Sequence, residues 1–306
     1  MNKKTNLFIV GAPKSGTTSF AELISSTTLV FSPKNIKEPA FFCQDKRIDS
    51  YNLNSGLKFF FPIETVEQYE SLYADSRNEK YLLDASVDYF DSKVAASKIR
   101  QYNSDAKIII ILREYNEYLI SLYKEMVKSA GEIPNGFNKN AHLGPLERNN
   151  LPKNLRSLMD IDYKERLKFS KMIDRYYDNF DPKNILILNF HQLINHNQDE
   201  EKKINDFLDI EINLENLPHS NNALNINNIF TFKIIYFLRK FKISKLFPTN
   251  LKQYVKNIFF YLSSSNSEDY KYVFNNNLLK VIEEDRKILE KKYGFSFKFQ
   301  EISKKK

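Results

Sequence analysis

The stretch FIVGAPKSGTTSF, residues 8–20, decides the fold, because it joins an apolar strand to a helix through a glycine-containing loop. The apolar run that ends at Val10 predicts a buried strand over residues 6–10, and apolar residues at helical spacing predict a helix over residues 17–25. Successive backbone amides in the loop between them, at the start of a helix, form a cradle for an anion. The sequence therefore predicts a phosphate-binding loop after the first strand.

This loop departs at one position from the triphosphate-binding pattern G-x-x-x-x-G-K-[ST]. Gly11, Gly16 and Thr18 match the pattern, but Thr17 stands where the lysine belongs, and the lysine of this loop is Lys14. Without the usual lysine, a triphosphate loses the cation that binds its β- and γ-phosphates. A nucleotide that carries one 5′-phosphate with a further group attached suits the loop better. The plain alternative is a glycine-rich turn without a ligand.

The rest of the chain repeats the order strand, helix, strand, helix. Strands are predicted at residues 80–84, 107–112 and 184–190, and helices at residues 64–74, 92–102, 116–130, 163–180, 200–208 and 277–292. This alternation is typical of an α/β fold with a central parallel sheet flanked by helices. Residues 131–158 have no periodicity and are rich in Asn, Gly and Pro, which predicts a long loop.

The length of 306 residues, with 42% hydrophobic residues, suits one domain with insertions. We expect a nucleotide-binding core at about residues 5–130 and 160–225, a mobile acceptor loop at about 131–158 and a helical C-terminal part at about 229–300. The single cysteine, Cys43, excludes an intramolecular disulfide and indicates a reducing compartment. Neither a secretory signal nor a transmembrane span is expected, so the predicted location is cytoplasmic.

The formal net charge is +8, which either reflects a composition biased toward Lys and Asn or indicates a polyanionic, nucleotide-like or membrane partner. The sequence has no nucleic-acid-binding signature, so no nucleic-acid partner is expected. Residues 234–262 mix apolar side chains with Lys and Arg. They are either core-packing helices or an amphipathic surface for peripheral contact with an anionic membrane. No Cys/His cluster predicts a metal site.

Three informative segments follow three strands of the predicted sheet: residues 11–18, residues 84–89 and Arg113. Ligands of open parallel α/β sheets bind at the carboxyl ends of the strands, so we expect these segments to meet in one crevice. There Arg113 would present a bidentate fork to a phosphate. The alternative for this arginine is a surface salt bridge with Glu114 or Glu117.

Four stretches of the sequence resemble one family. PKSGTT at Pro13 to Thr18 resembles the 5′-phosphosulfate loop of sulfotransferases that use 3′-phosphoadenosine-5′-phosphosulfate (PAPS). KEPAFFCQD at residues 37–45 resembles the Lys-Glu-Pro-His-Phe-Phe stretch of bacterial and heparan-type carbohydrate sulfotransferases, and LLDASVDYF at residues 82–90 follows in that family's order. ILREYNEYLISLY at residues 111–123 is similar to the family's 3′-phosphate motif.

The resemblance implies a P-loop α/β sheet and transfer of the sulfuryl group of PAPS to a hydroxyl or amine of a carbohydrate-type acceptor, with 3′,5′-bisphosphate (PAP) as product. It implies that the donor is bound by Pro13, Lys14, Ser15, Gly16, Thr17, Thr18, Arg113 and Ser121. In-line transfer depends on positioning and electrostatics. Because Lys14 can neutralise the leaving phosphate, no metal is expected. Glu38 is the candidate general base, with Asp84 or Asp88 next. Lys37 either keeps Glu38 ionised or contacts the sulfuryl group.

The sequence departs from the family pattern at Ala40, where the relatives have His, and at Ala85, where heparan-type relatives often have Lys. Residues 218–225 take the place of the family's basic 3′-phosphate loop without a Lys or Arg, and could cover the adenine. Two other interpretations therefore stay open. One is a P-loop kinase-like phosphotransferase that requires Mg²⁺, and the other is a catalytically weak module that binds PAPS or another polyanion.

Overall fold

The computed structural model describes residues 4–46, 63–128, 137–140, 162–218 and 271–297. The chain forms two compact units. The first comprises Met1–Glu114, Phe169–Ser220 and Arg286–Lys306, and the second comprises Tyr115–Lys168 and Asn221–Asp285. The predicted loop at 131–158 and the predicted membrane-contact segment at 234–262 lie almost entirely outside the described residues.

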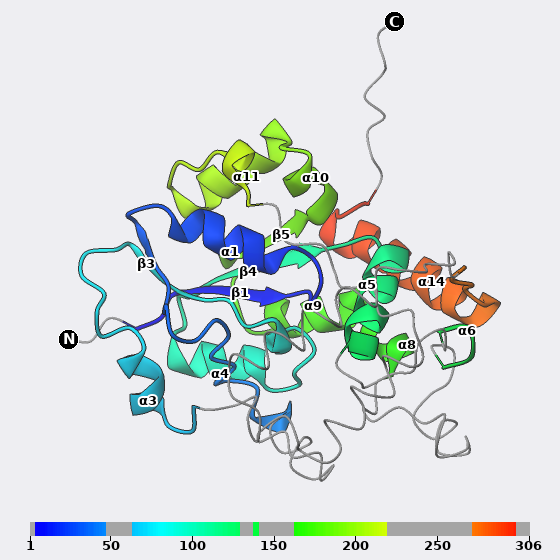
Figure 1. Ribbon diagram of the computed structural model, residues 1–306, viewed down its shortest axis with the longest axis horizontal. Coiled ribbons are helices and arrows are strands. Elements are labelled where there is room, and N and C mark those ends of the chain that lie inside the picture. Colours follow the sequence, from blue (N-terminus) through cyan, green and yellow to red (C-terminus); the bar gives the residue numbers. More distant parts are fainter. Residues whose placement is uncertain (1–3, 47–62, 129–136, 141–161, 219–270, 298–306) are drawn as a thin grey trace, which may run out of the picture. The chain divides into compact units, whose positions relative to one another are not determined.

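The first unit is built on a sheet that has five strands within the described ranges (Figure 1). They are β1 (Leu7–Gly11), β2 (Val30–Phe31), β3 (Tyr81–Asp84), β4 (Lys107–Leu112) and β5 (Ile185–Asn189). All pair in parallel, in the order β2-β3-β1-β4-β5. The chain thus leaves β1 on one side for β2 and β3 and continues on the other side with β4. The loop after β1 therefore starts where the strand order reverses, the usual ligand position in such sheets.

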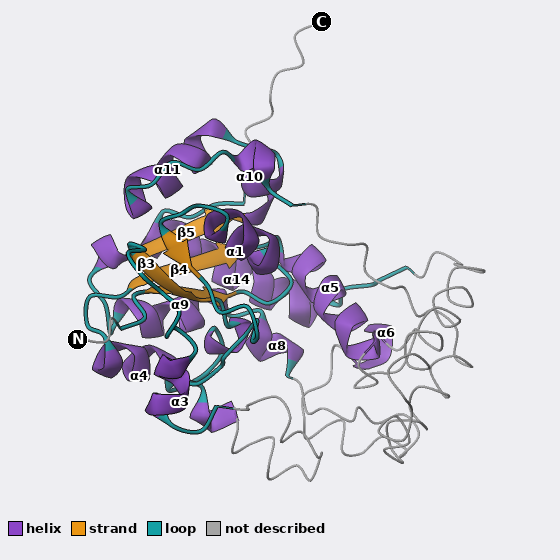
Figure 2. Cartoon of the chain, turned by 60° about the vertical axis from the view of Figure 1, so that its left-hand side comes forward, coloured by secondary structure: helices purple, strands orange, loops and turns teal. Residues whose placement is uncertain are grey.

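Helices cover both faces of this sheet (Figure 2). One face carries α1 (Thr17–Ser25), α10 (Phe190–Ile194) and α11 (Gln198–Leu208). The other carries α3 (Val66–Ser71), α4 (Ala95–Tyr102) and α9 (Phe169–Tyr177). Because both faces are covered, the interiors of the strands are apolar, as the runs in the sequence indicate, and the polar residues Asp84, Lys107 and Asn189 stand at strand ends.

The two sides of the sheet have different cores. Beneath α1, α10 and α11 the core is largely aliphatic, with Ile9, Ile109 and Ile111 of the sheet packed among helical side chains. On the other side the rings of Phe8, Phe42, Tyr69, Tyr89 and Tyr102 form an aromatic cluster. The cluster joins Phe8 of β1, Tyr69 of α3 and Tyr102 at the end of α4 to Phe42 and to Tyr89, which follows β3.

The second unit contains α5 (Tyr115–Lys128), α6 (Phe137–Asn140), α8 (Tyr163–Arg166) and the start of α14 (Asn276–Tyr293). Its described aromatic residues pack together, with ring centroids of Tyr123 5.3 Å from Phe137 and 5.9 Å from Tyr163. Tyr115 also donates a hydrogen bond of 2.5 Å to the buried Asp285 carboxylate.

The predicted α/β elements are confirmed, except that the short strand β2 was not predicted and three segments differ from the prediction. The single helix predicted at 163–180 is wrong, because α8 ends where the Leu167 and Lys168 amides bond to carbonyls three residues back, and α9 then starts at Phe169. The strand predicted at 184–190 ends at Asn189, whose side chain accepts a hydrogen bond of 2.9 Å from the His191 amide and so caps α10. In the predicted long loop, the four described residues are helical.

Gly11 ends β1 with φ of 147°, and a Cβ atom there would lie 2.5 Å from the Cβ of Phe90. Gly11→Ala should therefore destabilise the protein by about 3 kcal/mol or more, since the neighbouring atom is rigid. Gly294→Ala is the matched control, because Gly294 has φ of 63° with no described atom within 4 Å of the added carbon. Its cost should be only about 1–2 kcal/mol. Chemical denaturation measures both, and equal losses would contradict the close approach.

Candidate functional site

The loop between β1 and α1 has the backbone geometry of an anion cradle. Its turn is closed by a bond of 3.3 Å from the Ser15 amide to the Ala12 carbonyl. Lys14 and Gly16 both have left-handed backbone conformations, with φ of 63° and 77°. A Cβ atom on Gly16 would lie 2.7 Å from the Cε2 atom of Phe190. Only glycine therefore fits at this turn into the helix.

The start of α1 is suited to a negatively charged group. Its N-cap residue, Gly16, has no side chain that could accept hydrogen bonds from the first-turn amides, and the first turn contains no acidic residue. These amides carry the positive end of the helix dipole. Ser15 adds a fully buried hydroxyl without a hydrogen-bond partner among the described residues. Thr17 and Thr18 are the first two residues of the helix. The predicted phosphate loop thus fits a phosphate or phosphosulfate group.

Arg113 lies beside this loop because of the register between β4 and β5. Leu112 pairs with Asn189, so Arg113 and Phe190 are the first residues beyond adjacent strands. The guanidinium carbon lies 4.8 Å from the centroid of the Phe190 ring, and Nη1 donates a hydrogen bond of 3.2 Å to the Lys14 carbonyl. Glu114, the predicted alternative partner, forms its ion pair of 2.6 Å with Arg286.

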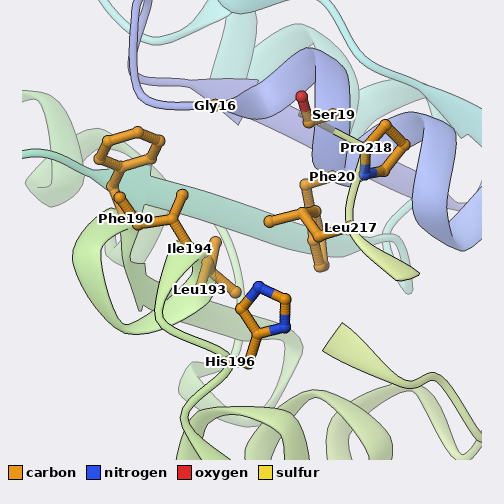
Figure 3. Close-up of a pocket in the computed structure, with 9 residues that line it drawn as sticks. All are labelled: Gly16, Ser19, Phe20, Phe190, Leu193, Ile194, His196, Leu217 and Pro218. Carbon is orange, nitrogen blue, oxygen red and sulfur yellow. The ribbon is translucent and has the colours of Figure 1, made fainter. Parts of the chain in front are cut away.

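A cavity of about 290 Å³ opens next to the loop, between α1 and α10 (Figure 3). It is mostly apolar, with an aromatic ring on the side of α10 and a histidine as a polar group. Its walls are formed by Gly16, Ser19, Phe20, Phe190, Leu193, Ile194, His196, Leu217 and Pro218. The cavity therefore shares Gly16 with the anion cradle and Phe190 with Arg113.

Glu38, the predicted general base, lies against the turn that follows β3. Its side chain is 31% exposed, and its carboxylate lies 3.9 Å from the ammonium group of Lys37. Burial raises the pKa of Glu38 above its usual value, whereas Lys37 and the backbone amide of Val87 act in the opposite direction. Lys37 itself is largely exposed, at 64%. A half-buried carboxylate with a raised pKa is a better proton acceptor than a solvated one.

The two other candidates for the general base, Asp84 and Asp88, bind groups within the protein. Asp84 is fully buried and accepts hydrogen bonds from the hydroxyls of Ser86, Tyr89 and Tyr69, at 2.5, 2.7 and 2.9 Å. Burial raises its pKa to about 6. Asp88 forms an ion pair of 3.1 Å with Lys46. Glu38 is therefore the best placed of the three carboxylates.

The three predicted segments lie next to one another at the carboxyl ends of β1, β3 and β4, since Gly11 adjoins Phe90 and Arg113 bonds to the Lys14 carbonyl. Of these segments, however, only Gly16 lines the described cavity. Ser121 lies in α5 of the second unit, so its predicted role as a phosphate ligand stays a prediction. Sequence reasoning missed Phe190, His196 and Ser86. In the sequence, the only signal for Phe190 is its position as the aromatic residue that ends the apolar run ILILNF.

Together the loop, the arginine and the cavity define a nucleotide-binding α/β protein of the P-loop type. The model of the sulfotransferase domain matches residues 4–294. The chain belongs to the sulfotransferase family and is a sulfotransferase enzyme with a P-loop NTPase-like fold. The family and the fold predicted from the sequence are thereby confirmed.

Solved structures of sulfotransferases are similar to this chain. The sulfotransferase of Alicyclobacillus acidocaldarius is 21% identical, with a TM-score of 0.57 over 72% of this chain and 87% of that chain. The sulfotransferase domain of the Synechococcus PCC 7002 olefin synthase is 14% identical, with a TM-score of 0.44 over 93% and 96%. A mouse sulfotransferase complexed with PAP is also 14% identical, with a TM-score of 0.44 over 95% and 85%. No curated protein matches the sequence.

Two features are absent from the described part of the chain. None of its helices combines the length and apolar character needed to cross a bilayer. Its histidine, cysteine and carboxylate side chains form no group of three or more that could hold a metal ion.

The pKa of Asp84 makes the stability of the fold depend on pH. The folded protein keeps this proton up to about pH 6, whereas the unfolded chain releases it near 3.8, so stability falls as the pH rises through this window. Between pH 3.8 and about 6, the unfolding free energy of the wild type should therefore drop by roughly 3 kcal/mol relative to that of Asp84→Asn, because one pKa unit corresponds to about 1.4 kcal/mol. Chemical denaturation at a series of pH values measures the difference.

Asp181→Asn is the control for this measurement. Asp181 is exposed and the Lys183 amide lowers its pKa, so it titrates below the window and its curve should run parallel to that of the wild type. A parallel curve for Asp84→Asn as well would show that the Asp84 pKa is ordinary.

Proposed function

We propose that this sulfotransferase moves the sulfuryl group of PAPS to a hydroxyl or amine of a carbohydrate-type acceptor, with Glu38 as the general base. The observation that carries the proposal is the meeting of Arg113 with the backbone of Lys14 at the uncapped start of α1. This arrangement offers two positively charged positions for phosphate groups, the amides at the start of α1 and the Arg113 guanidinium, beside an aromatic-lined cavity. PAPS, the usual donor of the family, carries a 5′-phosphosulfate and a 3′-phosphate on an adenosine.

The residues present fit this donor. The backbone N–H groups of residues 14–18, which follow Pro13, would hold the phosphosulfate together with the Lys14 side chain and the Ser15 hydroxyl. Arg113, and Ser121 as predicted, would bind the 3′-phosphate. The cavity next to Gly16 suits a flat purine base, because the Phe190 ring lines it. Pro218, the first residue of the segment predicted to cover the adenine, is part of the same wall.

Bound PAPS supplies a sulfuryl group on a good leaving phosphate, and the protein supplies position and charge. Glu38 accepts the proton of the acceptor hydroxyl or amine as its oxygen or nitrogen bonds to sulfur. The bond between sulfur and the phosphate oxygen breaks, and PAP leaves. Lys14 neutralises the charge that develops on this phosphate, so the reaction as proposed requires no metal ion. Lys37 limits the rise in the pKa of Glu38 and so keeps the base ionised.

The class of acceptor rests on the resemblance of residues 37–45 to carbohydrate sulfotransferases. A capsular polysaccharide, an exopolysaccharide or a glycolipid sugar is the proposed substrate, modified in the cytoplasm. Peripheral contact of residues 234–262 with an anionic membrane would bring the enzyme to a lipid-linked glycan. Ala40, which replaces the family's histidine, has no side-chain group that could contact an acceptor.

The nucleotide specificity tests the donor. The wild type should bind PAP in a thermal-shift assay and ATP with Mg²⁺ should give no shift. Arg113→Ala should weaken PAP binding roughly 10- to 150-fold, the equivalent of one charge-assisted hydrogen bond. Arg100→Ala is the matched control, because this exposed arginine donates to the Ser104 carbonyl just after α4.

Transfer of labelled sulfate from PAPS to a panel of polysaccharides should persist in EDTA.

Two results would contradict the donor assignment. Equal PAP affinity of the wild type and Arg113→Ala would remove the arginine from the phosphate site. Loss of transfer in EDTA with rescue by Mg²⁺ would restore the kinase-like interpretation. Binding of PAP without transfer to any acceptor would favour the module that only binds.

Glu38→Gln tests the general base. The substitution keeps the shape of the side chain and removes its basicity, so turnover should fall on the order of 10²-fold while PAP affinity stays the same. Because the pKa of Glu38 is raised, wild-type turnover should decline as the pH drops through a value above 4.5, and this decline should be missing in the variant. Glu22→Gln, an exposed change on α1, is the control. Near-normal turnover of Glu38→Gln would place the base elsewhere.

A further inference from the structure

We infer that Asp84 is a positioning residue, whose carboxylate fixes the backbone of residues 38–43 and thereby the proposed base Glu38 through the hydroxyls of Ser86 and Tyr89. The Asp84 side chain is fully buried, so it cannot itself contact an acceptor. Its influence on the reaction must therefore pass through other groups. The inference rests on the proposed function only for its catalytic consequence.

The direction of the hydrogen bonds links Asp84 to this segment. Ser86 donates its single proton to Asp84 Oδ1, at 2.5 Å, and its oxygen accepts a bond of 2.9 Å from the Ala40 amide. Tyr89 likewise donates to Asp84 Oδ2, at 2.7 Å, and accepts a longer bond of 3.4 Å from the Phe42 amide. An ionised carboxylate only accepts hydrogen bonds. It therefore orients both hydroxyl protons inward and leaves both oxygens free to hold the two amides.

Ala40 needs such support because of its backbone conformation. Its φ of 50° lies in the left-handed region, which is disfavoured for any residue with a Cβ atom. Such conformations persist where the surroundings hold them. Here the Ala40 amide is bound by Ser86, and the Ala40 carbonyl accepts a bond of 3.1 Å from the Cys43 thiol. The turn that follows Glu38 is thus fixed at both backbone polar groups of one residue.

The next part of the segment is anchored to the same region by charged groups. Asp45 accepts hydrogen bonds of 2.7 Å from the Ser92 hydroxyl and from the Lys93 amide. Lys46 forms ion pairs with Asp88 and Asp91. Residues 38–46 therefore lie along residues 84–93. The Val87 amide bonds to Glu38 itself, and the buried link to Asp84 through Ala40 is the next one along the chain.

An asparagine cannot replace the carboxylate in this network. Its amide oxygen could accept from Ser86 or from the tyrosines, but its nitrogen, which only donates, would then face the other partner. One of the two hydroxyl groups would lose its acceptor on residue 84. Its proton would then turn toward the backbone amide from which the hydroxyl oxygen accepts a hydrogen bond in the wild type. The arrangement therefore requires an acceptor on both sides of residue 84.

Hydrogen exchange tests the anchoring without any substrate. Ser86→Ala and Tyr89→Phe each remove one bridging hydroxyl while Asp84 stays in place. Exchange of the amides in residues 38–43 should become about fivefold faster in each variant, as for the loss of one ordinary hydrogen bond. Exchange in β1 and β4 should stay the same. Tyr73→Phe is the matched control, because this buried tyrosine packs against Tyr69 and donates its hydroxyl proton to the Leu83 carbonyl, at 3.1 Å.

Transfer of labelled sulfate from PAPS to a polysaccharide tests the catalytic consequence. Ser86→Ala should lower kcat on the order of tenfold, because a misplaced base is a poor one, while PAP affinity changes less than about twofold. Tyr73→Phe should leave kcat unchanged. In a Glu38→Gln background, Ser86→Ala should have no further effect on kcat, since the base through which it acts is already gone. A purely structural defect would lower kcat by the same factor in both backgrounds.

The outcomes separate this inference from the proposed function. Unchanged exchange at residues 38–43 in both hydroxyl variants would overturn the anchoring. An equal loss of kcat in the two backgrounds would overturn the link to Glu38. If Glu38→Gln keeps wild-type turnover while exchange at residues 38–43 still rises, the base was assigned wrongly, and the anchoring by Asp84 stands.

Discussion

The close contact between Phe190 and Gly16 is the constraint on which the rest of the site depends. The Phe190 ring leaves no space for a side chain at residue 16, and the same ring packs against the Arg113 guanidinium. This contact sets the distance from the anion loop to β5, and the register of β4 and β5 then decides where the arginine stands. Two elements that are 174 residues apart in the chain (from Gly16 to Phe190) thereby share one wall of the cavity.

The fold was predictable wherever a local pattern was strong. The runs LFIV (residues 7–10) and IIIIL (residues 108–112) are apolar without interruption, as expected for strands buried on both faces, and both lie in inner strands of the sheet. The helix after the loop matches its predicted bounds, because its apolar residues recur at helical spacing up to Ile24. The break at Leu167 was missed because the spacing of apolar residues continues across it.

The candidate site was predictable only where residues adjoin a strand end. Lys14 and Arg113 could be placed together because parallel strands end at the same edge of a sheet. The stacking of Arg113 on Phe190 was not accessible, since it depends on which strand lies beside β4 and in what register. The bonds of Ser86 and Tyr89 to the segment of Glu38 join residues more than 40 positions apart, and no local pattern reports them.

The buried carboxylate of Asp84 also bears on attempts to engineer this enzyme. A charge in the interior is held there against its preference for water, as its raised pKa indicates. An apolar residue at this position alone would not stabilise the protein, because the buried hydroxyls of Ser86, Tyr89 and Tyr69 would lose their acceptor. A more stable variant would have to replace the carboxylate and these hydroxyls together, and would then lose the bonds that hold the segment of Glu38, so stability and turnover pull the sequence in opposite directions at this cluster. Screens for robust forms of this fold should accordingly score product formation together with melting temperature.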